Sequence, residues 1–186
     1  MQAVKQDFAR LTLGMFAASF SSYPLTFSFV GQAEAPQGKA DVIDVKGPRD
    51  FALRLFVNDE THLPIMVSWQ TNPTPANIVL LAAGQTKPAT LAPGAIIVNV
   101  PAAPAASAAQ DEKDKYAKDV AAARAKAMAE NKIENRIYYA DYRDSDGLKF
   151  PFRLRRAIGT DTIEETTFDR FKLNSKIDPK KFEAIK

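Results

Sequence analysis

The chain has 186 residues, with 25 lysines and arginines against 22 aspartates and glutamates, which gives a formal net charge of +3. This length suits one domain with a sizeable core, so we expect a single domain over residues 1–186. The mild charge gives no indication of a nucleic acid partner. Because cysteine is absent, disulfides, thiolate metal sites and thiol nucleophiles are excluded.

The first segment has the spacing of an amphipathic helix, and its apolar residues recur at helical intervals: Val4, Phe8, Leu11 and Met15. Pro24 disfavours helical geometry at the residue before it, so the helix should end close to that point. A weak export-signal pattern is the alternative interpretation. We favour the helix, which places any export signal upstream of this chain. No apolar run is long enough to cross a bilayer, so a transmembrane protein is not expected.

A first meander follows the helix. Residues 25–29, 39–46, 51–57 and 65–69 alternate apolar and polar side chains, which is the period of half-buried strands. Turn residues separate them, including Pro36-Gln37-Gly38 and Gly47-Pro48-Arg49-Asp50. Such short links favour antiparallel neighbours over crossovers.

The middle of the chain breaks this pattern. Residues 71–110 contain many prolines around a short apolar piece, Ile78 to Ala82, so we expect loop and linker there, in which Ala95 to Val100 could form another strand. Residues 111–131 are rich in alanine and charged side chains and predict a long helix. Its apolar stripe is thin, so we expect a charged, exposed insertion that lies loosely on the sheet.

A second meander occupies residues 136–142, 148–156 and 162–173. Asp146-Gly147 between the first two strands is a strong hairpin signal. Pro151 cannot donate a ladder hydrogen bond, so its strand should lie at an edge or carry a bulge. We expect Ile177 and Phe182 in the following tail to pack against the end of the sheet.

Taken together, these segments predict an α+β fold. We expect a strongly curved antiparallel β-sheet of about seven to eight strands, an open and incomplete barrel. An N-terminal helix would cover it, and the charged helix would be inserted between the two meanders.

The sequence offers few parts for catalysis. His62 is the single histidine, so a serine–histidine–acid site or a histidine-based metal site lacks its components. The Asp144-Ser145-Asp146-Gly147 run has neither the preceding acid nor the following glutamate of a calcium loop. We therefore expect no enzyme, no catalytic residue, no metal and no cofactor.

Bulky apolar side chains alternate along the expected strands. They could line a cavity that accepts a lipid chain, or form an ordinary filled core: Phe27, Phe29, Leu53, Leu55, Trp69, Phe150 and Phe152. On the second strand of the second meander, Arg153, Arg155 and Arg156 could form a basic patch for lipid headgroups or an acidic partner, although we favour a solvated polar face.

Three stretches carry a resemblance to a known family. Tyr138 to Pro151, the tail from Ile163 to Phe182, and Asn58 to Ile65 resemble parts of bacterial periplasmic lipoprotein-carrier-like (LolA/LolB-like) domains. In that family helices cover the open side of an unclosed barrel, whose apolar interior receives acyl chains. The resemblance implies that Val4 to Phe20 is the covering helix. It also implies that this chain is a portion of a longer protein, since the family's first strands are missing, and the helix of residues 111–131 departs from the family pattern.

The function expected from these observations is non-enzymatic binding of lipid or lipoprotein acyl chains in the apolar concavity of an open β-barrel, in the periplasm or at the cell envelope. The alternative is a structural or protein-interaction domain with a filled core and no ligand. The expected partners are a lipid or acyl chain, or another protein. An exposed sheet edge left by missing strands would also promote self-association.

Overall fold

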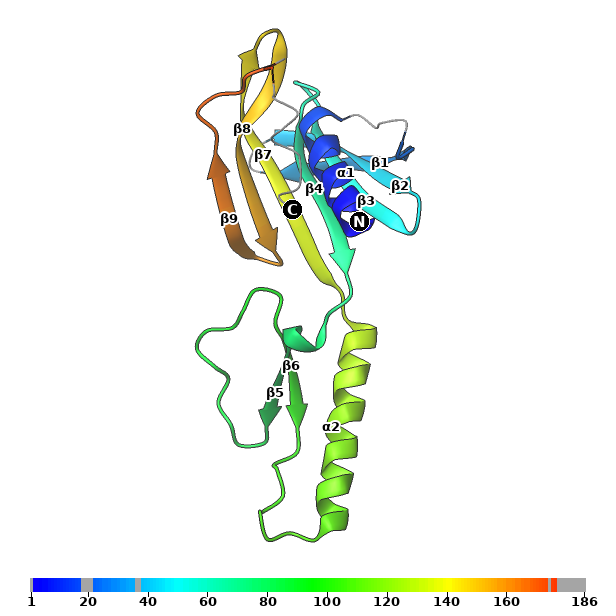
Figure 1. Cartoon of the computed structure of the whole chain (residues 1–186), viewed down its shortest axis with the longest axis vertical. Helices are drawn as coiled ribbons and strands as arrows, with labels where there is room; N and C mark the ends of the chain where they lie inside the picture. Colours follow the sequence, from blue (N-terminus) through cyan, green and yellow to red (C-terminus); the bar gives the residue numbers. More distant parts are fainter. Residues whose placement is uncertain (1, 18–21, 36–37, 174, 177–186) are drawn as a thin grey trace, which may run out of the picture.

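The structure is a computed structural model that describes residues 2–17, 22–35, 38–173 and 175–176 (Figure 1). The expected tail contacts of Ile177 and Phe182 lie outside these described residues. The first part of the chain forms helix α1 (Gln2–Phe16) and strands β1 (Thr26–Ala35), β2 (Gly38–Gly47), β3 (Phe51–Asn58) and β4 (Pro64–Thr71). The last part forms strands β7 (Ile133–Ser145), β8 (Leu148–Ile158) and β9 (Asp161–Thr167).

Within the described residues, these strands make one seven-stranded antiparallel sheet in the order β1-β2-β3-β4-β7-β8-β9. The α+β class and the antiparallel sheet predicted from the sequence are confirmed. The sheet is not closed, because β1 and β9 lie at its two edges and do not pair with each other. Self-association through these edges stays a prediction.

The hairpin between β7 and β8 is built as its turn residues predict. Asp146 and Gly147 both have positive φ, 53° and 83°, and the Gly147 amide donates to Oδ1 of Asp144 at 3.1 Å. Pro151 lies beyond the last pair of β8 with β9, Arg153 opposite Thr167, so β8 is a local edge at the proline. β9 ends at Thr167, earlier than expected, and the chain then folds Phe168 and Phe171 back towards the rings of β8.

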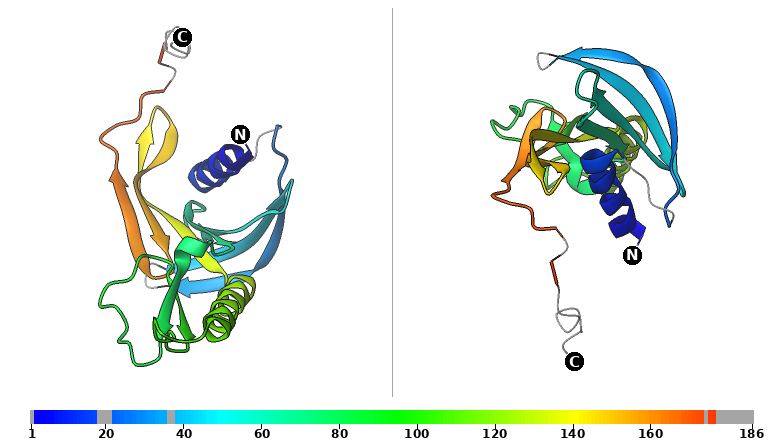
Figure 2. Two further views of the ribbon diagram at one scale, coloured as in Figure 1. Left: turned by 60° about the horizontal axis from the view of Figure 1, so that its bottom comes forward. Right: turned by 90° about the horizontal axis from the view of Figure 1, so that it is seen from above.

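Helix α1 lies across one face of the sheet (Figure 2), as expected for a covering helix, but it presents a different side from the one predicted. Ala9 and Leu13 are buried against the sheet, whereas Val4 and Phe8 are 71% and 56% exposed. Of the predicted stripe, Met15 packs against the core, but Val4 and Phe8 do not. The helix approaches the sheet through Ala9, Leu13 and Gly14, where the missing side chain of Gly14 leaves room for Tyr139. The helix ends at Phe16, and residues 18–20 of the expected helix lie outside the described part.

The core lies between α1 and this face of the sheet. Its buried members come from α1, from the segment before β1 and from four strands: Ala9, Leu13, Tyr23, Val45, Phe51, Leu53, Leu55, Val67, Ile137 and Tyr139. Each large side chain buried there stabilises the fold by roughly 1.5–3 kcal/mol. The α1 side of the sheet is therefore filled by the protein's own side chains.

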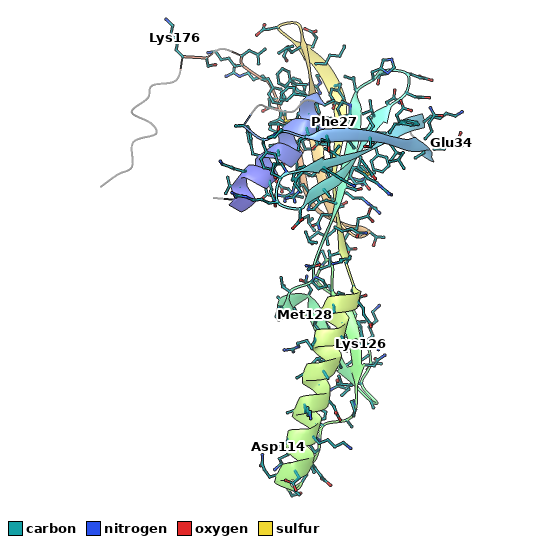
Figure 3. The ribbon with its side chains drawn as sticks, turned by 90° about the vertical axis from the view of Figure 1, so that its right-hand side faces the viewer. Phe27, Glu34, Asp114, Lys126, Met128 and Lys176 are labelled. Carbon is teal, nitrogen blue, oxygen red and sulfur yellow. The ribbon has the colours of Figure 1, made fainter. Side chains whose placement is uncertain are left out.

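Residues 72–132 form a separate lobe that extends from the ends of β4 and β7 (Figures 1 and 3). It contains a 3₁₀ turn (Pro75–Asn77), strands β5 (Ile78–Ala82) and β6 (Ile96–Val100), which pair in parallel, and helix α2 (Gln110–Glu130). The segment expected as loop and linker thus holds a strand at Ile78–Ala82 in addition to the one expected over residues 95–100. Helix α2 packs on those strands rather than on the large sheet, because β5 and β6 are apolar and need cover.

The lobe is inserted into what would otherwise be a simple hairpin. β4 and β7 pair directly up to Thr71 and Ile133. Asn135 Nδ2 also donates to Oγ1 of Thr71 at 3.0 Å. The two connections to the lobe therefore leave the sheet side by side.

Replacing residues 72–132 by Asn-Gly should give a protein that still folds, since a two-residue turn joins Thr71 to Ile133 in their existing register. We expect a modestly lower urea midpoint, because the lobe's Gly94 packs against Ile133 and Ile158. Circular dichroism and urea denaturation test this expectation. Removing residue 133 as well shifts the register by one and reverses the faces of the strand, so that control should fail to fold. Equal behaviour of the two deletions would contradict the insertion.

Candidate functional site

The face of the sheet opposite α1 carries a continuous row of side chains. Leu55, Val67 and Ile137 belong to the core under α1, so their neighbours along each strand point to the other side. One row there crosses the whole sheet through directly paired residues: Gly31, Val42, Phe56, Met66, Tyr138, Arg155 and Glu165. The row changes from apolar at β2, β3 and β4 to aromatic and charged at β7, β8 and β9.

A groove of about 700 Å³ lies over the part of this row that runs from Phe56 to Glu165. Small side chains from β1, β2 and β7 (Ala33, Ala40 and Ala140) leave room beside the larger Phe56 and Met66. Charged residues line it too: Glu34, Arg153, Arg155 and Glu165. Figure 3 shows Glu34 at the far end of β1 from Phe27. The groove thus combines an apolar floor with two cations and two anions.

Two register irregularities help to shape this face. The pairing of β1 with β2 shifts between Phe29 and Gly31, and that of β3 with β4 shifts between Phe56 and Val57. Such bulges bend a strand and increase its local twist. They lie on the strands that supply Ala33 and Phe56 to the groove.

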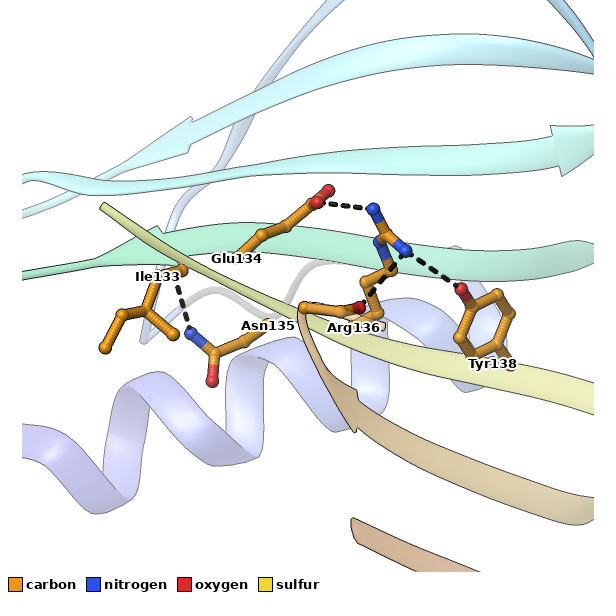
Figure 4. Close-up of polar contacts among 6 residues, drawn as sticks. Ile133, Glu134, Asn135, Arg136 and Tyr138 are labelled. Carbon is orange, nitrogen blue, oxygen red and sulfur yellow. Dashed lines mark hydrogen bonds and ion pairs between the residues drawn. The ribbon is translucent and has the colours of Figure 1, made fainter. Parts of the chain in front are cut away.

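Tyr138 lines the groove, and its hydroxyl takes part in a small network of polar contacts (Figure 4). Nη1 of Arg136 donates to the Tyr138 hydroxyl at 3.5 Å and to the carbonyl of Gly159 at 3.4 Å. The same guanidinium is ion-paired with Glu134, and this hydrogen bond raises the pKa of Arg136 above its ordinary value. Arg136 is therefore held in place beside the Tyr138 hydroxyl.

Arg155 approaches the same ring from its face. Its guanidinium carbon lies 4.2 Å from the centroid of the Tyr138 ring, which is a cation–π geometry. The neighbouring Arg153 places Nε 3.8 Å from Oε1 of Glu165. The predicted basic patch is thus divided, because Arg156 points to the opposite face and pairs there with Glu164 at 3.3 Å.

The seven side chains predicted to line a ligand cavity share the α1 side of the sheet. Leu53 and Leu55 are buried in the core, and Trp69 packs against it with the Arg10 guanidinium 4.9 Å from its ring. Phe27 and Phe29 on the edge strand remain 44% and 67% exposed.

The remaining pair of predicted lining residues is packed between rings of the same chain. Phe150 stacks on Phe171 at 4.6 Å and meets Phe16 edge-on at 5.5 Å, while Phe152 meets Phe171 at 5.1 Å. The expected cavity wall is therefore occupied by α1 and by the segment after β9, except at Phe27 and Phe29.

Two tyrosines of β7 fasten α1 to this wall. The Tyr139 hydroxyl donates to the Arg10 carbonyl at 3.4 Å, and the Tyr142 hydroxyl lies 3.5 Å from the Gly14 carbonyl of α1 and 2.8 Å from the Pro64 carbonyl of β4. Burial raises the pKa of both phenols above the ordinary tyrosine value. They therefore stay neutral across the physiological range and act as hydrogen-bond donors.

The other candidates carry no site in the described part of the chain. His62 is exposed in the turn between β3 and β4, with a φ of 56°. The described residues contain no group of acidic and histidine side chains that could hold a metal ion. None of the described helices combines the length and the apolar character needed to cross a membrane.

The groove floor was missed from the sequence, although one signal for it was available. Phe56 and Met66 occupy positions that strand alternation assigns to the face away from the core. Large apolar residues in such positions indicate a second apolar surface rather than solvent exposure.

No protein-family model, curated protein or solved structure matches this chain.

Proposed function

We propose that this chain binds the acyl chain of a lipid or lipoprotein, without covalent chemistry, in the groove opposite α1. The observation that carries the proposal is the apolar floor of Ala33, Phe56 and Met66 within a groove of about 700 Å³. Small-molecule sites typically occupy roughly 300–1,000 Å³ and combine an apolar lining with a few polar groups. The groove has both features, with its polar groups gathered near Tyr138.

Binding of this kind needs no catalytic group. Each methylene removed from water contributes about 0.8 kcal/mol, so a chain lying along the floor supplies its own affinity. Release then requires only dissociation or transfer to another apolar surface. The proposal is thus a carrier or sensor function in which the ligand leaves unchanged.

The resemblance of Tyr138 to Pro151 to lipoprotein-carrier-like domains supports the same class of ligand. On this proposal the unclosed sheet acts as a strongly curved, incomplete barrel, and the protein works in the periplasm or at the cell envelope. The site differs from the one that the resemblance implies, because α1 already fills that side of the sheet.

Native mass spectrometry of the purified protein, followed by lipid extraction, tests the proposal. We expect mass adducts of lipid size, and we expect delipidated protein to bind a fluorescent fatty acid with saturation at one equivalent. Protein that carries no lipid and also fails to bind the fluorescent acid would contradict the proposal.

A structural or protein-interaction role is the second candidate, and the lobe favours it. Ile78 and Val100 are buried, but the other apolar side chains of β5 and β6 are only half-buried, on both faces of the pair. A parallel pair with two apolar faces ordinarily has both covered. The charged helix α2 would then belong to a contact surface for another protein.

The variant that replaces residues 72–132 by Asn-Gly distinguishes the two candidates. Acyl-chain binding in the groove predicts that this variant keeps its affinity for the fluorescent acid. The interaction role predicts that it loses its protein partner while its sheet remains folded. Loss of fatty-acid binding in a folded variant would move the ligand site to the lobe.

A further inference from the structure

We infer that the groove selects an amphiphile with an oxyanion headgroup, a carboxylate or a phosphate, and that Arg155 is the residue that binds this headgroup. The inference rests on the proposed function and adds the chemical class of the ligand. It is carried by the pairing of the charges around the groove and by the position of Arg155 over Tyr138.

The first step is the distribution of ion pairs on the two strands that flank Tyr138. β7 and β8 contain five arginines. Four of them have a carboxylate partner: Arg136 with Glu134, Arg143 with Asp141, Arg153 with Glu165, and Arg156 with Glu164. Arg155 makes no ion pair with any residue in the described part of the chain. It is therefore the one arginine of these strands without a carboxylate partner among the described residues, and it lines the groove.

The nearest candidate partner of Arg155 is already engaged. Glu165 lies directly opposite Arg155 in the pairing of β8 with β9. Its Oε1, however, lies 3.8 Å from Nε of Arg153. Arg153 is two residues before Arg155 on β8 and therefore lies on the same face. The carboxylate thus compensates the neighbouring arginine.

The second step is the placement of the free guanidinium. Packing over the Tyr138 ring at 4.2 Å holds it above the groove floor. Tyr138 pairs directly with Met66, which in turn pairs with Phe56. A headgroup at Arg155 would therefore send its acyl chain along the row towards the apolar residues of β4 and β3.

The third step is a second donor for the same headgroup. The Tyr138 oxygen accepts a hydrogen bond from Arg136, so its own hydroxyl hydrogen is left to donate. A guanidinium with its parallel N–H groups matches a carboxylate or phosphate. Arg155 and Tyr138 together present donors, while the Glu165 carboxylate opposite Arg155 is paired with Arg153. This arrangement favours an oxyanion over a neutral or cationic headgroup.

Displacement of an uncharged fluorescent probe, N-phenyl-1-naphthylamine, by three ligands with the same chain tests the inference. Dodecanoate and dodecyl phosphate carry an oxyanion, and dodecanol does not. In the wild-type protein we expect at least one of the anions to bind more tightly than the alcohol, by about tenfold or more, since hydrogen bonds to charged groups contribute about this much. The better anion identifies the headgroup as carboxylate or phosphate.

Arg155→Gln should remove this preference, because it lowers the affinity for the better anion more than the affinity for dodecanol. Arg156→Gln is the matched control, because it deletes the same charge on the opposite face and should keep the preference. Both residues are exposed, so thermal melts should show that both variants fold. Equal affinity of the alcohol and both anions for the wild type would overturn the headgroup inference alone, as would an equal effect of the two variants. Failure of all three ligands to displace the bound probe, or of the probe to bind at all, would contradict the proposed function itself.

Discussion

Gly14→Ala is expected to destabilise the protein severely, by about 3 kcal/mol or more. A Cβ atom built on Gly14 would lie 2.0 Å from both Cζ and the hydroxyl oxygen of Tyr139, far inside any real contact. The ring cannot move away easily, because Tyr139 is buried in the core. At an exposed helical position the same substitution would stabilise the helix by about 1 kcal/mol, so the sign of the effect reports the close approach of α1 to the sheet.

Urea denaturation measures this effect, and a second-site variant provides its control. In Gly14→Ala/Tyr139→Leu the new methyl group no longer meets the ring. The double variant should therefore be more stable than the sum of the two single effects predicts, with a coupling of about 1 kcal/mol or more. An unchanged or raised midpoint in Gly14→Ala would show that α1 does not pack on Tyr139 as the structure has it.

Ala140→Phe is expected to weaken binding of a fluorescent fatty acid by tenfold or more. Ala140 lies on β7 between the floor of the groove and Arg153, its partner on β8, and a phenyl ring there occupies space needed by the chain. If the ring keeps two methylenes of the fatty-acid chain exposed to water, the binding free energy is weakened by about 1.6 kcal/mol, which lowers the affinity about tenfold. The folded state should tolerate the change, since aromatic residues suit strands.

Ala52→Phe is the matched control for this prediction. Ala52 is exposed on β3 and does not line the groove, so the same ring should leave fatty-acid affinity unchanged. Fluorescence titration of both variants, with urea midpoints measured in parallel, separates blockage from unfolding. Wild-type affinity in a folded Ala140→Phe variant would place the ligand elsewhere.

Local chemistry explains why much of the sheet could be predicted. Asp146-Gly147 fixes a two-residue turn, and the alternation of Phe51, Leu53 and Leu55 assigns one face of β3 to the core. These signals act between residues that are close in sequence. They establish strands and hairpins without any knowledge of distant partners.

The missed features depend on contacts between distant segments. The side that α1 presents to the sheet follows from the fit of Gly14 beneath Tyr139, which lies 125 residues later in the chain. The parallel pairing of β5 with β6 likewise joins segments separated by a loop without regular strands. Helical periodicity alone favoured the large residues Val4 and Phe8, which lie exposed instead.

The candidate site divides in the same way. Arg153 and Arg155 were identified from their positions on one strand, and both line the groove. The floor was sought on the face of Leu53 and Leu55, because alternation identifies two faces but does not show which one a helix covers. That choice is made by the packing of α1.

Photo-crosslinking with a fatty acid that carries a diazirine at the end of its chain tests the central claim most directly. Fragment spectra of the labelled peptides locate the adduct to single residues. An acyl chain in the groove should label Phe56, Met66 or Ala33, on the face opposite α1. Labels confined to Leu53, Leu55, Trp69 or α1 would contradict this account and return the ligand to the side of the sheet that α1 fills.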